Sequence, residues 1–137
     1  MRRKNIIVVD DELLIRDLLY DFFTERDWGV AVYGSSENVL EAVRTKKYDI
    51  VLVDLKLPEV DGISLVSKIK DLYPELPVII MTAFPSVETA VEALRLKVDD
   101  YITKPFNINR LFKTLDGIVE KSREKSVAVR SEDVLPG

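Results

Sequence analysis

The chain contains five short runs of apolar residues, separated by longer segments in which apolar positions recur with a helical period. Three of the runs are continuous and rich in Val and Ile, without the alternation of a strand that has one face in water. This pattern is typical of strands that are buried on both faces of a parallel sheet. The runs cover residues 6–9, 30–33, 50–53, 78–81 and, most weakly, 101–102.

Apolar residues in the intervening segments recur at intervals of three and four, which places them along one face of an α-helix. We predict that these stripes face the core. The stripes are Leu14, Leu18 and Phe22; Val39 and Val43; Leu65, Ile69 and Leu72; Val87, Ala90, Val91 and Leu94; and Leu111, Leu115, Ile118 and Val119.

Strand and helix therefore alternate five times along the chain. Such alternation predicts an α/β fold with a parallel sheet and helices on both faces. Right-handed crossovers make it a doubly wound (βα)5 sandwich. We expect the flavodoxin-like strand order 2-1-3-4-5, and the order 3-2-1-4-5 stays open on the pattern alone.

The length of 137 residues suits one domain. We predict that the domain covers residues 1–121. Helical periodicity fades after Lys121, so residues 122–137 are expected to be a frayed helix end followed by a tail or the start of a linker.

Composition excludes several kinds of chemistry. The chain has no Cys and no His, which rules out disulfides, thiolate or imidazole metal sites and a Ser-His-Asp triad. A net charge of −4 argues against a nucleic-acid interface on this domain. No apolar run approaches the roughly 18 residues that span a bilayer, and the run that ends at Val9 is too short for a signal peptide. A cytoplasmic location without membrane contact is the simplest interpretation.

Reactive side chains follow four of the five predicted strands. They are Asp10 and Asp11, Asp54, Thr82 and Lys104. The carboxyl ends of parallel strands form the ligand-binding edge of such sheets. Clustered carboxylates favour a hard divalent cation, and a cation, an ammonium and a hydroxyl together suit a phosphoryl group. Because Cys and His are absent, a carboxylate must be the nucleophile, and Asp54 at the central strand is the best candidate.

Four motifs around these residues resemble the receiver domain of two-component response regulators. They occur in the family's order and spacing over about residues 4–121, and their combination is far more specific than any one of them. The motifs are residues 7–12 (IVVDDE), 52–62 (LVDLKLPEVDG), 80–83 (IMTA) and 101–106 (YITKPF).

The resemblance implies that Asp54 accepts a phosphoryl group from the phosphohistidine of a sensor histidine kinase or a histidine phosphotransfer protein. It also implies a Mg²⁺ site, which Mn²⁺ could occupy instead. The ligands would be Asp10, Asp11, Asp54 and the backbone carbonyl of Lys56, with Asp11 the main direct ligand. By this resemblance the domain is a signalling phosphoacceptor, not an enzyme, and it assists its own phosphorylation and dephosphorylation.

The same resemblance assigns the remaining motif residues. Thr82, the backbone N–H of Ala83 and Lys104 would bind the phosphoryl oxygens. Thr82 and Tyr101 would form the switch, which alters the face of the fourth helix, fifth strand and fifth helix. That face would serve a downstream partner or output domain, and it is a candidate for homodimerisation. The motifs are similar both to stand-alone phosphorelay receivers and to receivers of enhancer-binding regulators, and we leave this choice open.

Two side chains are expected at the mouth of the site, Lys56 two residues after Asp54 and Phe84 two residues after Thr82. We expect them to obstruct an attacking water and to give a slowly hydrolysed phosphoaspartate.

Three further positions carry structural expectations. Lys97 stands where many receivers have Gly, so it must accept a left-handed conformation or end the helix differently. Pro85 is expected to start the fourth helix. The Lys104-Pro105 bond is a candidate cis peptide, and Trp28 is expected at the end of the sheet opposite the site.

Other interpretations were weighed against these. Asp10 and Asp11 could simply cap a helix, Thr82 could do the same, and Tyr101 could be a packing residue. A phosphatase of the haloacid dehalogenase type needs a second Asp two residues after the nucleophile, where this chain has Lys56. A flavodoxin-like electron carrier needs a Ser/Thr/Gly-rich loop after the first strand. A degenerate receiver that only docks would have no need of the complete residue set.

Overall fold

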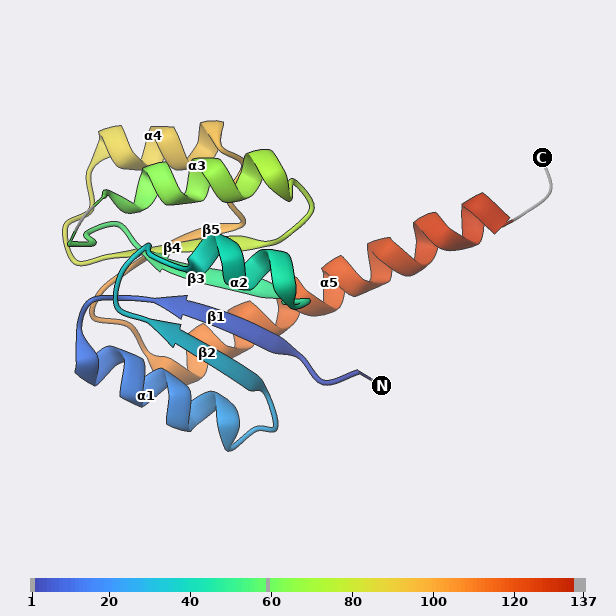
Figure 1. The fold of residues 1–137 in the computed structure, drawn as a ribbon, viewed down its shortest axis with the longest axis horizontal. Coiled ribbons are helices and arrows are strands. Elements are labelled where there is room, and N and C mark those ends of the chain that lie inside the picture. Colours follow the sequence, from blue (N-terminus) through green and yellow to red (C-terminus); the bar gives the residue numbers. More distant parts are fainter. Residues whose placement is uncertain (1, 59, 135–137) are drawn as a thin grey trace.

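The computed structural model describes residues 2–58 and 60–134, with side chains described as far as residue 126. Five parallel strands form one sheet in the order β2-β1-β3-β4-β5, which confirms the predicted topology (Figure 1). The strands are β1 (Asn5–Val9), β2 (Gly29–Tyr33), β3 (Ile50–Asp54), β4 (Val78–Thr82) and β5 (Asp100–Thr103). The helices are α1 (Leu13–Thr24), α2 (Val39–Thr45), α3 (Gly62–Leu72), α4 (Val87–Arg95) and α5 (Ile108–Val134).

The helices cover the sheet on both faces. Helices α1 and α5 lie on one face, and α2, α3 and α4 lie on the other (Figure 1). Successive residues of β1 point to opposite faces, so Ile7 joins the core under α3 while Ile6 joins the core under α1. All residues of β1, β3 and β4 are buried, which explains why these strands read as uninterrupted apolar runs.

The predicted core face of α1 is wrong at Leu14 and Leu18, whereas Phe22 packs against the core as predicted. Leu14 is 82% exposed and Leu18 is exposed, whereas Leu19 and Phe23 are buried one position further along. Residues 15, 19 and 23 form a second apolar stripe beside residues 14, 18 and 22. Periodicity cannot choose between two adjacent apolar stripes, and the docking of α1 on the sheet makes the choice.

The prediction for α4 is also wrong. Val87 and Leu94 are 81% and 76% exposed, and Ala93 is the buried residue of this helix. Leu72 at the end of α3 is likewise exposed. Helix α4 buries only a narrow stripe because it covers the edge of the sheet beside β5, a strand that is itself no more than half-buried. The predicted stripes of the other three helices are confirmed at Val39 and Val43 of α2, at Leu65 and Ile69 of α3, and at Leu111, Leu115 and Val119 of α5.

Lys97 adopts the left-handed conformation, with φ at 60°. The backbone N–H of Val98 donates to Ala93 at 3.2 Å and that of Lys97 donates to Leu94 at 3.1 Å, the bonding pattern of a Schellman helix end. The expectation for Pro85 is wrong, because Ser86 is the N-cap of α4 and leaves the proline outside the helix.

Three other expectations have outcomes in the backbone. The Lys104-Pro105 bond is cis, as predicted. Trp28 precedes β2 at the amino end of the sheet and packs against Phe23, with ring centroids 5.0 Å apart. Helix α5 continues past Lys121 to Val134, where the sequence predicts fraying. The domain boundary itself stays a prediction. No helix within the described ranges combines the length and hydropathy needed to cross a membrane.

Candidate metal and phosphoryl site

The four chemically active segments meet at the carboxyl ends of the strands. Asp10 follows β1, Asp54 ends β3, Thr82 ends β4 and Lys104 follows β5. The strand order places β1, β3, β4 and β5 side by side. The parallel sheet therefore brings together residues that lie up to 94 positions apart in the chain.

Lys104 lies at the centre of this site. Its Nζ donates to Asp10 Oδ2 at 2.7 Å, to Glu12 Oε1 at 2.9 Å and to Asp54 Oδ2 at 3.0 Å. Burial opposes the charge of the ammonium, but these three hydrogen bonds outweigh burial and raise the pKa of Lys104. The lysine is therefore held protonated between the carboxylates.

Asp10 is the most deeply buried carboxylate of the site, with no exposed surface. Burial raises the pKa of its carboxyl group, although hydrogen bonds from Lys104 and from the backbone N–H of Glu12 act in the opposite direction. The nearby charge of Asp54 adds to the increase. The positive charge of Lys104 thus neutralises only part of the negative charge of the carboxylates around it.

A divalent cation fits this excess of negative charge. Asp10, Asp11, Glu12 and Asp54 each offer a carboxylate oxygen, and these oxygens lie within 4.8 Å of one another. Asp10 and Asp54 are buried, whereas Asp11 and Glu12 are exposed. Oxygen donors that are partly open to water match the preference of Mg²⁺, which retains several water ligands. Glu12 is the member that the sequence reasoning missed, although the IVVDDE motif contains it.

The loop after β3 holds Asp54 in place. The backbone N–H of Lys56 donates to Asp54 Oδ1 at 3.1 Å, and Gly62 N–H donates to the carbonyl of Leu55 at 2.7 Å. A β-carbon at Gly62 would collide with the backbone carbonyl oxygen of Asp54. Asp61 caps α3 by accepting the N–H of Ser64 at 2.8 Å, which confirms the interpretation of Asp61-Gly62 as a turn and helix cap.

Arg16 supports the loop after β1. Its guanidinium donates to the backbone carbonyl of Asp10 at 2.8 Å. Gly34, after β2, leaves space for the Arg16 guanidinium, because a β-carbon at this position would lie only 2.8 Å from Arg16 Nη1. Sequence reasoning missed Arg16, since a charged residue inside an amphipathic helix gives no signal that distinguishes it from a solvated one.

Thr82 and Tyr101 are predicted to act together, but the structure gives their hydroxyl groups separate partners. Thr82 is buried, and its Oγ1 accepts the backbone N–H of Phe84 at 2.9 Å. The Tyr101 hydroxyl lies 2.7 Å from Thr89 Oγ1 and accepts the N–H of Ser86 at 3.4 Å. Tyr101 is therefore bound to the first turn of α4.

Lys56 and Phe84, two residues after Asp54 and Thr82, contact each other. Lys56 Nζ lies 3.8 Å from the centroid of the Phe84 ring, a cation–π contact between two loops. Phe84 is 64% exposed, so its ring covers the loops from outside. The two positions that the sequence singles out thus contact each other.

Comparison with known proteins places this geometry in a family. The sequence model of the response regulator receiver domain matches residues 6–116. The transcriptional regulatory protein ZraR of Salmonella typhimurium is 42% identical over 129 residues, which are 93% of this chain and 29% of that protein. The DNA-binding transcriptional regulator NtrC of Proteus hauseri is 34% identical over 98% of this chain and 28% of its own length. The chain thus spans less than a third of these relatives.

Solved structures agree with the sequence comparison. A CheY-like response regulator receiver domain protein from Methanospirillum hungatei has a TM-score of 0.87 and 26% identity, with 90% of this chain and 99% of that chain covered. The receiver domain of the Francisella response regulator 1452 has a TM-score of 0.80 and 30% identity, with 88% and 99% covered. Receiver domains of this family generally bind Mg²⁺ and serve as phosphoacceptors. The chain therefore belongs to the receiver domain family of two-component response regulators.

Proposed function

We propose that Asp54 is the phosphoacceptor of this receiver domain. A carboxylate oxygen of Asp54 attacks the phosphorus of a phosphohistidine, the P–N bond breaks, and the imidazole leaves with a proton. The product is an acyl phosphate on Asp54. The position of this carboxylate at the end of the central strand, next to Lys104 Nζ, supports the assignment.

Lys104 and the loop after β4 are proposed to bind the transferred group. The Lys104 ammonium gives up its hydrogen bond to Asp54 and donates to a phosphoryl oxygen instead. Its remaining hydrogen bond to Asp10 keeps it oriented. The Thr82 hydroxyl and the backbone N–H of Ala83 donate to further oxygens. To do so, the Thr82 side chain turns away from the N–H of Phe84, to which it is bonded now.

A cation is proposed to complete the site. Mg²⁺ held by Asp10, Asp11, Asp54 and the backbone carbonyl of Lys56, or Mn²⁺ in its place, would neutralise the charge that develops on the phosphoryl oxygens. The cluster of carboxylate oxygens supports this ligand set. Asp11 is exposed, so it leaves room for water molecules in the coordination shell.

One observation carries the proposal, the contact of Lys104 with both Asp10 and Asp54. The test is the intact mass after incubation with acetyl phosphate, with and without Mg²⁺, for the wild type and Asp54→Asn. We expect one added phosphoryl group that requires Mg²⁺ and is absent from the variant. An adduct that persists in Asp54→Asn would place the acceptor elsewhere. If acetyl phosphate gives no adduct, the reaction is repeated with a phosphorylated histidine phosphotransfer protein. An adduct then indicates a receiver that accepts phosphate only from protein donors. No adduct indicates a domain that has lost the reaction.

The lifetime of the phosphoaspartate is the second proposed property. Water must approach in line with the acyl phosphate bond, and we expect the contact between Lys56 and Phe84 to obstruct that approach. We propose slow hydrolysis of the kind found in phosphorelay intermediates, with the site residues assisting the reaction of water when it does enter. The decay of the phosphorylated mass should accelerate in Lys56→Ala/Phe84→Ala, and a wild-type half-life of seconds would contradict the proposal.

Switching is proposed to run through Thr82 and Tyr101. When Thr82 turns to the phosphoryl group, Tyr101 is expected to leave Thr89 and move inward, which releases the first turn of α4. The exposed side chains Val87 and Leu94 lie on the face that would change its affinity for a partner or a second copy. Nuclear magnetic resonance of the Tyr101 ring before and after phosphorylation tests this step.

The proposed partners follow from the family. A sensor histidine kinase or phosphotransfer protein would supply the phosphoryl group, and an output domain or protein would read the switched face. The relatives named as transcriptional regulators are several times longer than this chain, which supports an output domain in the same polypeptide. The receiver of NtrX from Brucella abortus, 32% identical with a TM-score of 0.85, also forms only 31% of its chain.

A further inference from the structure

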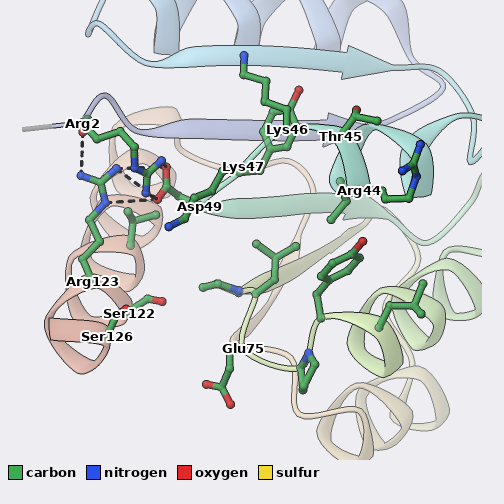
Figure 2. Close-up of a pocket in the computed structure, with 18 residues that line it drawn as sticks. Arg2, Arg44, Thr45, Lys46, Lys47, Asp49, Glu75, Ser122, Arg123 and Ser126 are labelled. Carbon is green, nitrogen blue, oxygen red and sulfur yellow. Dashed lines mark hydrogen bonds and ion pairs between the residues drawn. The ribbon is translucent and has the colours of Figure 1, made fainter. Parts of the chain in front are cut away.

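The amino ends of the strands carry a groove at the end of the sheet opposite the acidic site (Figure 2). We call it the amino-end groove; its walls are residues 43–49, residues 70–77 and residues 118–126 of α5, with Lys97 and Asp99 at one end. It consists of two hollows, of about 820 and 730 Å³. Both hollows are lined by Pro74, Pro77 and Ser126, so they adjoin along the loop before β4.

The lining of the amino-end groove is basic. Nine Lys and Arg side chains line it against three acidic ones, a local net charge of +6 in a chain whose net charge is −4. Two of the acids are already paired, Asp49 with Arg2 and Arg123, and Asp99 with Lys70. Within the described part of the chain, the remaining basic lining residues that form no ion pair are Lys46, Lys47, Lys97, Lys121 and Lys125.

Helix dipoles do not account for this charge. Helices α2, α3 and α4 end here, and each carboxyl end carries the equivalent of about −0.5 charge. Three helices therefore balance only about a quarter of the excess positive charge. Arg44 is also paired, with Glu41, so the positive charge available to a ligand lies on the five lysines named above.

Lys97 adds an independent observation. It holds a left-handed backbone, a conformation that costs a non-glycine residue about 1 kcal/mol and glycine almost nothing. Its side chain lines the same hollow as Lys121 and Lys125. The fold alone would therefore favour glycine at this position, and the lysine adds a positive charge to the lining of the hollow.

The shape and lining indicate the occupant. The larger hollow has apolar walls that include Tyr48, Tyr73 and Leu72, and the smaller hollow is lined by the lysines. An occupant of both must be elongated, negatively charged and partly apolar. Compact phosphate ligands prefer the N–H groups of helix N-termini, whereas helices end here with carbonyls. A nucleic-acid duplex is too wide for hollows of this volume. An extended acidic peptide with apolar side chains matches both the lysines and the apolar walls.

We propose that the amino-end groove binds an acidic peptide segment of a partner protein, whose apolar side chains enter beside Tyr48 and Tyr73 while its carboxylates pair with Lys97, Lys121 and Lys125. The groove lies at the amino ends of β3 and β4, whereas Asp54 is the last residue of β3, at the other end of the sheet. Binding therefore leaves phosphorylation possible. Because α5 forms one wall, the peptide is also expected to fix the helical extension that leads out of the domain.

The probe is a fluorescein-labelled peptide of 12 residues in which Glu and Asp alternate with Leu and Phe, and its control carries Gln and Asn in place of the acids. Fluorescence anisotropy should show binding of the acidic peptide that weakens with salt. The variant Lys97→Glu/Lys121→Glu/Lys125→Glu should weaken it at least tenfold. The variant Lys68→Glu/Arg110→Glu/Lys113→Glu has the same charge change outside the groove and should stay within twofold of the wild type.

Lys97→Gly separates binding from folding. Removing the backbone strain should raise the temperature of unfolding. Removing the lysine charge should lower the affinity for the acidic peptide. The proposal is overturned if the two peptides bind equally, if the two triple variants lose the same affinity, or if a DNA duplex displaces the peptide. Asp54→Asn should bind the peptide like the wild type, so this test is independent of the proposed phosphorylation.

Discussion

The two ends of the sheet have opposite electrostatic designs. At the carboxyl end, the ammonium of Lys104 lies among the carboxylates of Asp10, Glu12 and Asp54. At the amino end, the carboxylate of Asp49 lies between the guanidinium groups of Arg2 and Arg123 (Figure 2).

This difference distinguishes the end whose charges are neutralised by its own side chains from the end that could hold a metal ion. Asp49 is fully satisfied, since it accepts the N–H of Asn5 at 2.8 Å in addition to its two arginine partners. Arg123 also donates to the backbone carbonyls of Arg2 and Arg3, so it fastens α5 to the start of β1. At the carboxyl end the negative charge exceeds the positive, and the acidic cluster could hold a metal ion. One end is held together by its own ion pairs, and the other is the proposed site for a metal and a phosphoryl group.

The largest effect is expected from Lys104→Met. It removes the cation that would neutralise the phosphoryl oxygens, so phosphorylation of Asp54 by acetyl phosphate should slow roughly 100-fold. The measurement is the rate at which the phosphorylated mass appears at saturating Mg²⁺. Lys113→Met, which removes an exposed lysine of α5, is the control and should react at the wild-type rate. Equal rates in the two variants would show that Lys104 does not act on the phosphoryl group.

Asp49→Ala tests the structural end of the comparison. It leaves Arg2 and Arg123 unpaired and removes the acceptor of the Asn5 N–H, so the free energy of unfolding should fall by about 2–3 kcal/mol. Urea denaturation without Mg²⁺ measures this change. Glu41→Ala removes an exposed ion pair with Arg44 and should cost less than about 0.5 kcal/mol. Phosphorylation of folded Asp49→Ala should proceed normally, and its loss would mean that the two ends are not separable.

Arg16→Ala should weaken the carboxyl end without abolishing it. Arg16 holds the backbone carbonyl of Asp10, and loss of such a supporting bond typically lowers metal affinity about tenfold. Isothermal titration with Mg²⁺ measures the effect. Arg26→Ala, which removes a guanidinium from the other end of α1, should keep the wild-type affinity. A Mg²⁺ affinity unchanged in Arg16→Ala would remove Arg16 from the site.

Thr89→Val should give the smallest effect. It deletes the hydroxyl that meets Tyr101 and keeps the side-chain shape, so the free energy of unfolding should fall by about 1 kcal/mol or less. The Tyr101 ring should become more mobile in nuclear magnetic resonance spectra. Thr24→Val, whose hydroxyl bonds only to carbonyls of its own helix, is the control. An unchanged Tyr101 ring would mean that Thr89 does not hold it.

Much of the site could be predicted from the sequence because it rests on short motifs at strand ends. Asp10, Asp54 and Thr82 each follow an apolar run directly, Lys104 follows the fifth run after Thr103, and a parallel sheet brings such positions to one edge. Arg16 could not be found this way. Its role depends on the angle at which α1 leaves the sheet and on the space beside Gly34.

The sequence by itself determined the elements, their order and the chemistry at the carboxyl ends, because apolar periodicity and the residues after each strand are local properties. Only the tertiary structure decided which of the two stripes of α1 is buried, and that α4 leaves Val87 and Leu94 exposed. It alone also brought Asp49 between Arg2 and Arg123, 121 residues apart. These features depend on how helices dock on the sheet, and docking is set by the summed packing of both partners, which no single segment encodes.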